Sequence, residues 1–190
     1  MNTETRVISE VPRPSSRGGT AGPMADTNAR LVAADRWLEQ EETTLRVGSH
    51  EFVIRRAGPA HTPEDLVVHV PRRGVMFAGD LVFRGRIPFV GQADSRQWIE
   101  SLARLIAWKP KLVIPGHGPA STDPLPDLEL TRDYLAYLRT TMGQAARNMD
   151  PFDEAYAKTD WSRFERVPLF RAANRMNAFN TYLLMERQAK

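Results

Sequence analysis

The sequence predicts a single folded unit of the α/β class, an α+β type of sandwich in which a mostly antiparallel sheet is covered by helices on one side. Alternation of period two, rich in β-branched residues, dominates residues 43–79, whereas helical periodicity dominates residues 94–187. A short apolar run over residues 111–114 interrupts the helical half and has the length of a buried strand. The 190 residues suffice for one domain with a core, and two full domains are not expected.

Four strands are expected in the first half of the chain. The stretches "TTLRVG" (43–48) and "EFVIRRAG" (51–58) meet at a Gly-Ser pair that suits a tight turn. The stretches "DLVVHV" (65–70) and "GVMFAG" (74–79) are joined by "PRRG", which again suits a hairpin. The simplest arrangement of the four is an antiparallel meander.

A helix is predicted over residues 94–108, with Asp94 or Ser95 as its N-cap and a Lys-Pro pair after its end. The strand over residues 111–114 follows and is expected to stop at Pro115. The helical spacing predicts one buried stripe, made of Trp98, Leu102, Leu105 and Ile106.

Three further helices are predicted. A long amphipathic helix covers residues 125–149, a last helix covers about residues 168–187, and a short helix covers residues 25–37 with Asp26 or Thr27 as a cap. The stripe of the long helix consists of Leu128, Thr131, Leu135 and Leu138.

Residues 1–27 are rich in Pro, Ser, Gly, Thr and Arg and are expected to form a disordered tail, which leaves residues 28–190 as the folded part. No apolar run approaches the roughly eighteen residues of a membrane span, and the first residues lack the apolar stretch of a secretory signal. We therefore expect no membrane partner and a cytoplasmic protein. A periplasmic location is the alternative if a lost N-terminal segment carried a signal.

Composition excludes several kinds of site. The chain has no cysteine, so disulfides, thiolate catalysis and zinc-finger sites are excluded, and any metal must be held by His, Asp or Glu. The net charge of +3 comes from scattered, nearly balanced charges with no basic stripe. A nucleic-acid partner is therefore not expected.

Three short elements carry residues suited to chemistry: "GPAHTPED" with His61, "FAGDLVF" with Asp80 and "VIPGHGP" with His117. Each is expected at the end of a strand in a turn rich in Gly or Pro, and strand ends can converge on one edge of a sheet. Histidine and aspartate suit zinc, and they are also compatible with iron or manganese. Taken singly, each has a plainer explanation. His61 would be a solvated or capping turn residue, Asp80 a turn residue that bonds its own backbone, and His117 a histidine in a tight bend.

In this order, the three elements resemble the second half of the metallo-β-lactamase superfamily, whose late ligand motifs read Gly-x-x-His-Thr, Gly-Asp after an apolar strand, and Gly-His-Gly. The likeness extends over about residues 30–188 and includes "LVFRGRIPFVGQADSRQWIESLARL", "VIPGHGPASTDP", "LTRDYLAYLR" and "PFDEAYAKTDWSRF". These stretches are similar to the quinoprotein relay system zinc metallohydrolases and to metallohydrolases of sulfur-oxidation operons. The resemblance implies a partial metallo-β-lactamase fold.

The resemblance also implies roles for the three residues. His61 would ligate one zinc, His117 would ligate a second zinc, and Asp80, the catalytic candidate, would bridge both. A zinc-bound hydroxide would then hydrolyse an ester, thioester or amide of a small-molecule substrate. From spacing alone, Thr62 and Asp65 are expected to support His61, because a ligating imidazole usually donates its other N–H to an oxygen.

One departure from the family is large. The His-x-His-x-Asp-His motif of the family's first half does not occur here, and the other two histidines, His50 and His69, are expected at the surface. Each zinc would keep two protein ligands, so metal should be weak or partial. The N-terminal half of the fold would be missing, and one apolar sheet face would be uncovered.

Three interpretations follow. The chain is a zinc-dependent metallohydrolase that is truncated, a non-catalytic remnant, or an interaction module whose partner completes the metal site. The uncovered face requires compensation by self-association or a partner chain, by the helix near residues 25–40 acting as a lid, or else poor stability. The substrate itself is not readable, because only residues 84–92, "RGRIPFVGQ", offer a pocket loop.

Overall fold

The computed structural model describes residues 37–91 and 93–188. The chain divides into two compact units, Met1–Gln40 and Glu41–Lys190, and the sheet and all the described helices belong to the second. The tail predicted over residues 1–27 lies outside the described residues. The helix predicted over residues 25–37 does too, except for Trp37, which is not helical.

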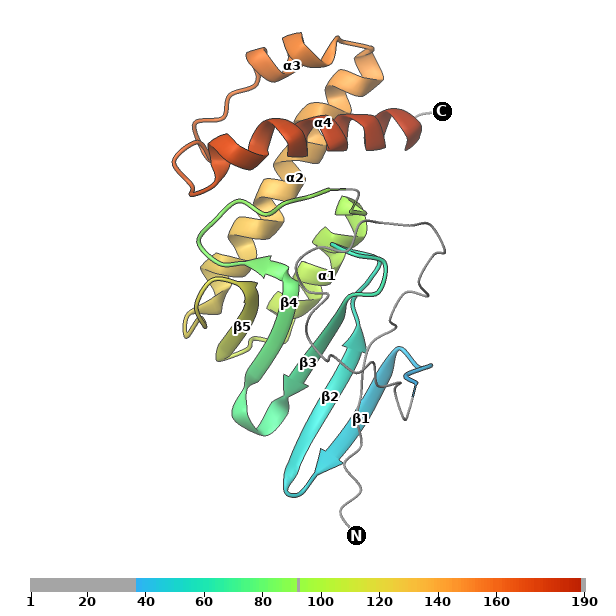
Figure 1. The fold of residues 1–190 in the computed structure, drawn as a ribbon, viewed down its shortest axis with the longest axis vertical. Coiled ribbons are helices and arrows are strands. Elements are labelled where there is room, and N and C mark those ends of the chain that lie inside the picture. The colour runs from blue at the N-terminus through green and yellow to red at the C-terminus, as the bar shows by residue number, and fades with distance from the viewer. Residues whose placement is uncertain (1–36, 92, 189–190) are drawn as a thin grey trace, which may run out of the picture. The chain divides into compact units, whose positions relative to one another are not determined.

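Five strands form one sheet in the order β1-β2-β3-β4-β5 (Figure 1). They are β1 (Glu42–Val47), β2 (His50–Arg56), β3 (Leu66–Val70), β4 (Val75–Phe83) and β5 (Leu112–His117). The first four pair antiparallel as a meander, and β5 joins β4 in parallel after a helical crossover. The predicted meander of four strands is confirmed.

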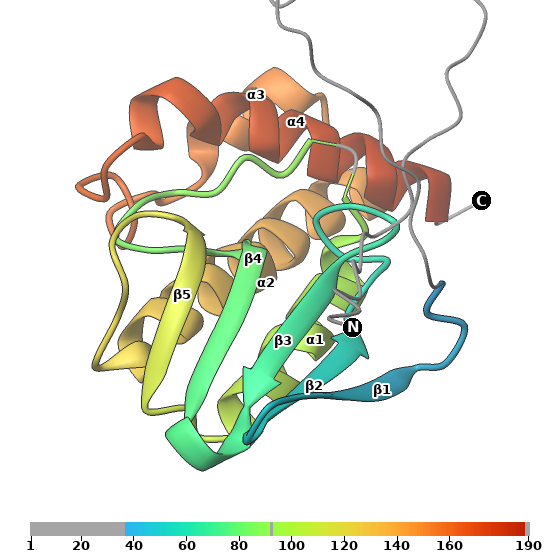
Figure 2. The same cartoon turned by 60° about the horizontal axis from the view of Figure 1, so that its bottom comes forward.

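Four α-helices accompany the sheet, namely α1 (Ser95–Ala107), α2 (Pro124–Asn148), α3 (Phe152–Lys158) and α4 (Phe170–Gln188). Within the unit Glu41–Lys190, α1 and α2 lie against one face of the sheet, and α4 lies beyond the ends of β4 and β5 (Figure 2). The predicted fold class, a mostly antiparallel sheet covered by helices on one side, is confirmed. Helix α3 was not predicted, because a helix of seven residues is too short to show a periodic pattern.

The core lies between the sheet and the two helices α1 and α2. Its predicted members from α1 and α2 are buried, except that Ile106 is only partly buried. Complete burial of a large apolar side chain stabilises the folded state by about 1.5–3 kcal/mol. The largest fully buried side chains include Met76, Leu81, Phe83, Trp98, Leu102, Leu105, Leu128, Tyr134, Leu135 and Leu138. Within residues 37–91 and 93–188, no helix is both long and apolar enough to cross a membrane.

Two strands run further than predicted. Strand β4 continues past Gly79 to Phe83, with an irregular register at Gly79, where φ is +52°. Strand β5 continues through Pro115 to His117. It is the last strand in the sheet order, and an edge strand tolerates a proline because its outer side needs no ladder hydrogen bond. Asp80 therefore lies within a strand and not in a turn after one.

Asp94 caps α1, as the sequence predicts. Its carboxylate accepts hydrogen bonds from the backbone N–H groups of Arg96 and Gln97, both at 3.1 Å. Partial burial raises the pKa of this carboxyl, but the hydrogen bonds from Gln97 and Arg96 and the Arg96 charge outweigh it, so the pKa lies below its usual value of 3.8. The ionised cap is thus favoured in the folded state.

We expect Asp94→Ala to lower the free energy of unfolding by about 1 kcal/mol, because two N–H groups at the helix start lose their acceptor. Asp94→Asn, which keeps an acceptor oxygen, should cost much less. Because the folded pKa is depressed, the contribution of the charge is present above pH 3.8 and is lost as the pH falls through the folded pKa. Urea unfolding at neutral pH and near pH 3 checks both points, and an equal loss for both variants would contradict the capping role.

Candidate metal centre

The three predicted ligand residues come together at one end of the sheet. His61 Nε2 lies 3.8 Å from Asp80 Oδ2, and His117 Nε2 lies 3.5 Å from Asp80 Oδ1. Each imidazole therefore faces a different oxygen of the same carboxylate. The side chains of Asp80 and His117 are 43% and 48% exposed, whereas that of His61 is 19% exposed, so the carboxylate stays accessible to solutes.

His61 is held by a loop between β2 and β3. The backbone N–H groups of Ala57 and Gly58 donate to Asp65 O at 2.7 and 3.0 Å, which closes the loop at its base. Ser101 Oγ of α1 donates to Ala57 O at 2.7 Å and ties this base to the helix. The loop is thus fixed to the sheet and to α1 before any ligand binds.

Thr62 and Asp65 contact each other and do not contact the ring of His61. The Thr62 backbone N–H and hydroxyl donate to the two Asp65 carboxylate oxygens at 2.8 and 2.9 Å. His61 Nδ1 is buried and has no hydrogen-bond partner among the described residues. The structure therefore pairs Thr62 with Asp65 and shows no hydrogen bond from either to His61 Nδ1, and their support of a metal-bound His61 stays a prediction.

Gly116 leaves the space in which the Asp80 carboxylate sits. A Cβ atom at position 116 would lie 1.9 Å from Asp80 Oδ1, 2.7 Å from Gly79 C and 2.8 Å from Asp80 N. No side chain can therefore stand at position 116 while β4 and β5 keep this approach. The first glycine of the Gly-His-Gly motif is explained by this contact.

Gly118 has a different role. Its φ of +101° is a conformation that side-chain-bearing residues rarely adopt, and a Cβ atom there would lie 2.9 Å from Arg84 Cβ. The chain can therefore turn sharply after His117 and pass close to Arg84. Gly116 thus leaves room for Asp80, and Gly118 leaves room for Arg84.

Two buried aromatic residues form a wall behind the histidines. Phe83 stacks on His117, with ring centroids 4.6 Å apart, and meets the edge of His61 at 5.6 Å. Trp98 meets His61 at 5.0 Å and donates its indole N–H to Leu81 O at 3.0 Å. The sequence predicted Trp98 as core and did not single out Phe83. The spacing of three from Asp80 gave no signal, because side chains alternate along a regular strand and the register of β4 is irregular between Gly79 and Phe83.

The loop that follows β4 is anchored to the helices by buried amides. Asn177 of α4 accepts from Val90 N at 2.9 Å and donates to Pro88 O at 2.7 Å. Asn177 also donates to the hydroxyl of Tyr134, whose pKa is raised by burial, so that this phenol stays protonated. The stretch 84–91 is therefore a fixed loop whose first residue follows Phe83 of the site.

The other two histidines lie away from the site. His50 is exposed at the start of β2. His69 is half-buried and not a surface residue, and its ring stacks on Trp108 with a centroid distance of 6.1 Å. Burial, followed by the nearby charge of Arg55, lowers the pKa of His69.

The donor set suits a pair of divalent ions bridged by Asp80. Two neutral imidazole nitrogens and a carboxylate with two accessible oxygens are donors that zinc accepts. Each ion would receive one histidine and one oxygen of Asp80. Among the residues that the structure describes, no three His, Asp or Glu side chains converge so as to hold one ion. The described residues thus provide two donors per ion.

Comparison with known proteins bears on this geometry. The family model described as the metallo-beta-lactamase superfamily matches residues 6–117, which is more than half of the chain. The chain belongs to the metallo-β-lactamase superfamily. Among curated proteins, it is 34% identical over 77 residues to metallo-beta-lactamase IND-1 of Chryseobacterium indologenes, a match that covers 38% of this chain and 32% of that protein. The chain therefore spans about a third of the length of this relative.

One solved structure supports the fold assignment. The sec-alkylsulfatase Pisa1 from Pseudomonas sp. superposes with a TM-score of 0.66 over 83% of this chain and 28% of that chain, at 18% identity. A metallo-beta-lactamase from Pontibacter korlensis gives a TM-score of 0.49 over 55% of this chain and 50% of that chain, at 27% identity. The alkylsulfatase match shows that the described elements form part of the superfamily's α/β fold.

We expect Gly116→Ala to lower the free energy of unfolding by about 1–3 kcal/mol, because β4 and β5 must separate to admit a methyl group. In the double variant Gly116→Ala/Asp80→Ala, only part of this loss should be recovered, since the backbone atoms Gly79 C and Asp80 N still lie within 2.8 Å of the added carbon. Chemical denaturation of the single and double variants, with Asp80→Ala as the reference, measures the difference. A Gly116→Ala protein as stable as the wild type would show that the strands do not approach as described.

Proposed function

We propose that this chain contributes to a zinc-dependent hydrolase centre in which His61 and His117 each hold one zinc ion and Asp80 bridges the two. The observation that carries the proposal is the placement of the two Nε2 atoms, 3.8 and 3.5 Å from opposite oxygens of one carboxylate. This placement leaves one carboxylate oxygen of Asp80 on the side of each histidine. Membership of the superfamily supports zinc over the other metals that accept these donors, iron and manganese.

The protein residues have separate tasks in this proposal. Asp80 would help to hold the zinc through its carboxylate, whose side chain is 43% exposed and therefore open to a substrate. Phe83 and Trp98 fix the two imidazole rings by packing. Bound zinc would supply a coordinated water of lowered pKa and a positive charge that polarises a carbonyl or ester group. We propose an ester, thioester or amide of a small molecule as the substrate class. We further propose that the chain belongs to the subgroup of quinoprotein relay system and sulfur-oxidation metallohydrolases, which several of its sequence stretches resemble.

Two donors per ion is one fewer than a catalytic zinc usually has. We therefore propose that further donors come from outside the described residues, on another polypeptide segment or a partner chain. If they do not, the same geometry supports the alternative, a non-catalytic module with a partial metal site. Metal content separates the two possibilities.

An apolar row on the sheet face opposite α1 and α2 supports a partner, although one of its members, Ile54, is buried. Ile54, Val68, Phe77 and Ile114 lie directly opposite one another on β2 to β5, so that their side chains share one face. Met76 and Val113, the neighbours of Phe77 and Ile114, are buried on the helix side. Phe77 in this row is 44% exposed. We propose that a second copy or a partner chain covers this row.

The metal centre is tested by elemental analysis of protein equilibrated with zinc and then desalted. We expect the wild type to retain zinc, and His61→Ala and His117→Ala each to lose at least half of it, because each removes one of the two donors to an ion. His50→Ala is the matched control and should retain the wild-type amount, since His50 lies away from the site. A wild type that retains zinc which neither His61→Ala nor His117→Ala loses would contradict the proposed centre.

The partner proposal is tested by sedimentation velocity over a range of concentrations. We expect Phe77→Lys to reduce self-association at least several-fold, because a charge then interrupts the apolar row. Leu125→Lys is the control, since Leu125 is 49% exposed on α2 and lies off the sheet. A wild type that is monomeric throughout would exclude a second copy and leave only a different chain as the partner.

A further inference from the structure

We infer that Arg84 is a positioning residue for His117: it clamps the segment 117–121 to β4 and to α2, and thereby sets where the His117 imidazole points. The inference rests on the proposed metal centre for its functional meaning, but the clamp itself can be tested without metal. Neither the family match nor the relatives assign Arg84 a role.

The first contact of the clamp is made by the backbone. Arg84 directly follows the last residue of β4, and its N–H donates to His117 O at 2.9 Å. This bond joins the chain leaving β4 to the last residue of β5. It holds the main chain of His117 next to Phe83, on which the His117 ring stacks.

The second contact is made by the guanidinium group, which binds three acceptors. Its Nη1 donates to Pro119 O at 3.3 Å and to Ala120 O, and its Nε lies 3.1 Å from Asp127 Oδ2. An arginine fork can bind two carbonyls and a carboxylate at once, whereas a lysine ammonium is a single charge on a flexible stem. Arginine at position 84 can therefore bind the carbonyls after His117 and the Asp127 carboxylate at the same time.

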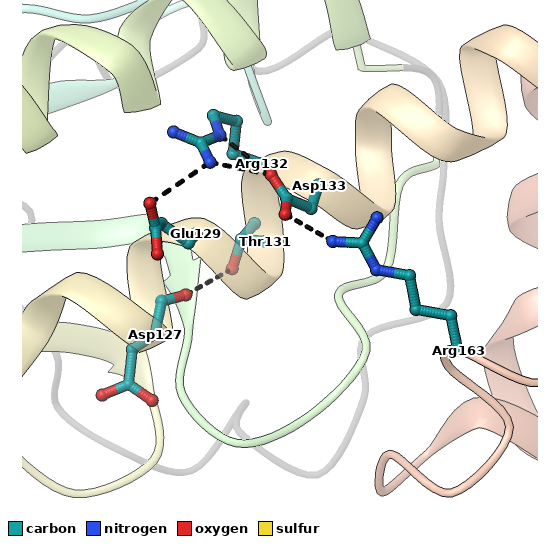
Figure 3. Close-up of polar contacts among 6 residues, drawn as sticks. All are labelled: Asp127, Glu129, Thr131, Arg132, Asp133 and Arg163. Carbon is teal, nitrogen blue, oxygen red and sulfur yellow. Dashed lines mark hydrogen bonds and ion pairs between the residues drawn. The ribbon is translucent and has the colours of Figure 1, made fainter.

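Asp127 connects the clamp to α2. It lies in the first turn of the helix, where a negative charge is favoured by the helix dipole, and its Oδ2 also accepts from Ser121 Oγ at 2.5 Å. Ser121 exchanges two backbone hydrogen bonds with Val113 of β5. Figure 3 shows the Asp127 carboxylate directed away from the group formed by Arg132, Asp133 and Arg163, while its carbonyl accepts from Thr131. The carboxylate is thus free to serve the Arg84 clamp.

His117 needs such a clamp because its own backbone is permissive. Glycines flank it on both sides, and glycine restricts the chain less than any other residue. Its side chain is 48% exposed, so packing on Phe83 restrains only one face of the ring. The Asp127 side chain, only 17% exposed, gives the clamp a partly shielded anchor.

The clamp is tested first in metal-free protein by NMR of the histidine side chains. We expect Arg84→Met to shift and broaden the imidazole nitrogen signals of His117 and to speed amide hydrogen exchange of Ser121 at least several-fold, while the signals of His50 stay unchanged. Arg84→Lys, which keeps the charge opposite Asp127, should give a smaller change of the same kind. Arg163→Met is the matched control, because Arg163 pairs with Asp133 on the same helix but lies outside the clamp (Figure 3).

The second readout is zinc affinity, measured by competition with a chelating dye. Loss of a group that orients a ligand lowers metal affinity about 10–100-fold. We expect Arg84→Met to lower the affinity for the zinc that His117 holds by about that factor, Arg84→Lys to lower it less, and Arg163→Met to leave it unchanged.

If the wild type binds no zinc while the His117 signals still respond to Arg84→Met, the proposed metal centre fails and the clamp stands. If the His117 signals and Ser121 exchange in Arg84→Met and Arg84→Lys match those of Arg163→Met, the clamp is overturned. Should Arg84→Met not fold, Arg84→Lys and Asp127→Asn carry the same comparison.

Discussion

The close approach of β4 and β5 is the constraint on which the rest of the site depends. These are the only parallel neighbours among the described strands, and at their ends Gly116 passes so near to Asp80 that no Cβ atom fits between them. This approach places the Asp80 carboxylate beside the last residue of β5, His117. It also brings the chain leaving β4 against the chain leaving β5, where Arg84 and Gly118 meet.

Apolar packing, more than hydrogen bonding, holds the two imidazole rings. Phe83 contacts both histidines and is almost completely buried, and Trp98 supports His61 from α1. His61 Nδ1 has no partner among the described residues, which is unusual for a buried polar atom. Packing against Phe83 and Trp98, together with the loops that carry the histidines, therefore orients the ring nitrogens toward Asp80.

The helical layer has two functions. Helices α1 and α2 cover one sheet face and complete the core, and the buried amide of Asn177 on α4 ties the loop after β4 to Tyr134 of α2. The opposite sheet face carries the apolar row that includes Phe77.

The sequence by itself determined the meander, α1 with Asp94 or Ser95 as its cap, α2 and α4, because these depend on local periodicity and capping. The grouping of His61, Asp80 and His117 was expected from short motifs at strand ends that together resemble a known family. It missed α3, which is too short to show a period, and it ended β4 and β5 too early, because a glycine and a proline usually stop a strand. Only the tertiary structure decided that Asp65 binds Thr62, that Phe83 contacts both histidines, and that Arg84 reaches Asp127. The physical reason is that these contacts join residues through the parallel pairing of β4 with β5 or through competition between nearby acceptors, and neither leaves a periodic signal in the sequence.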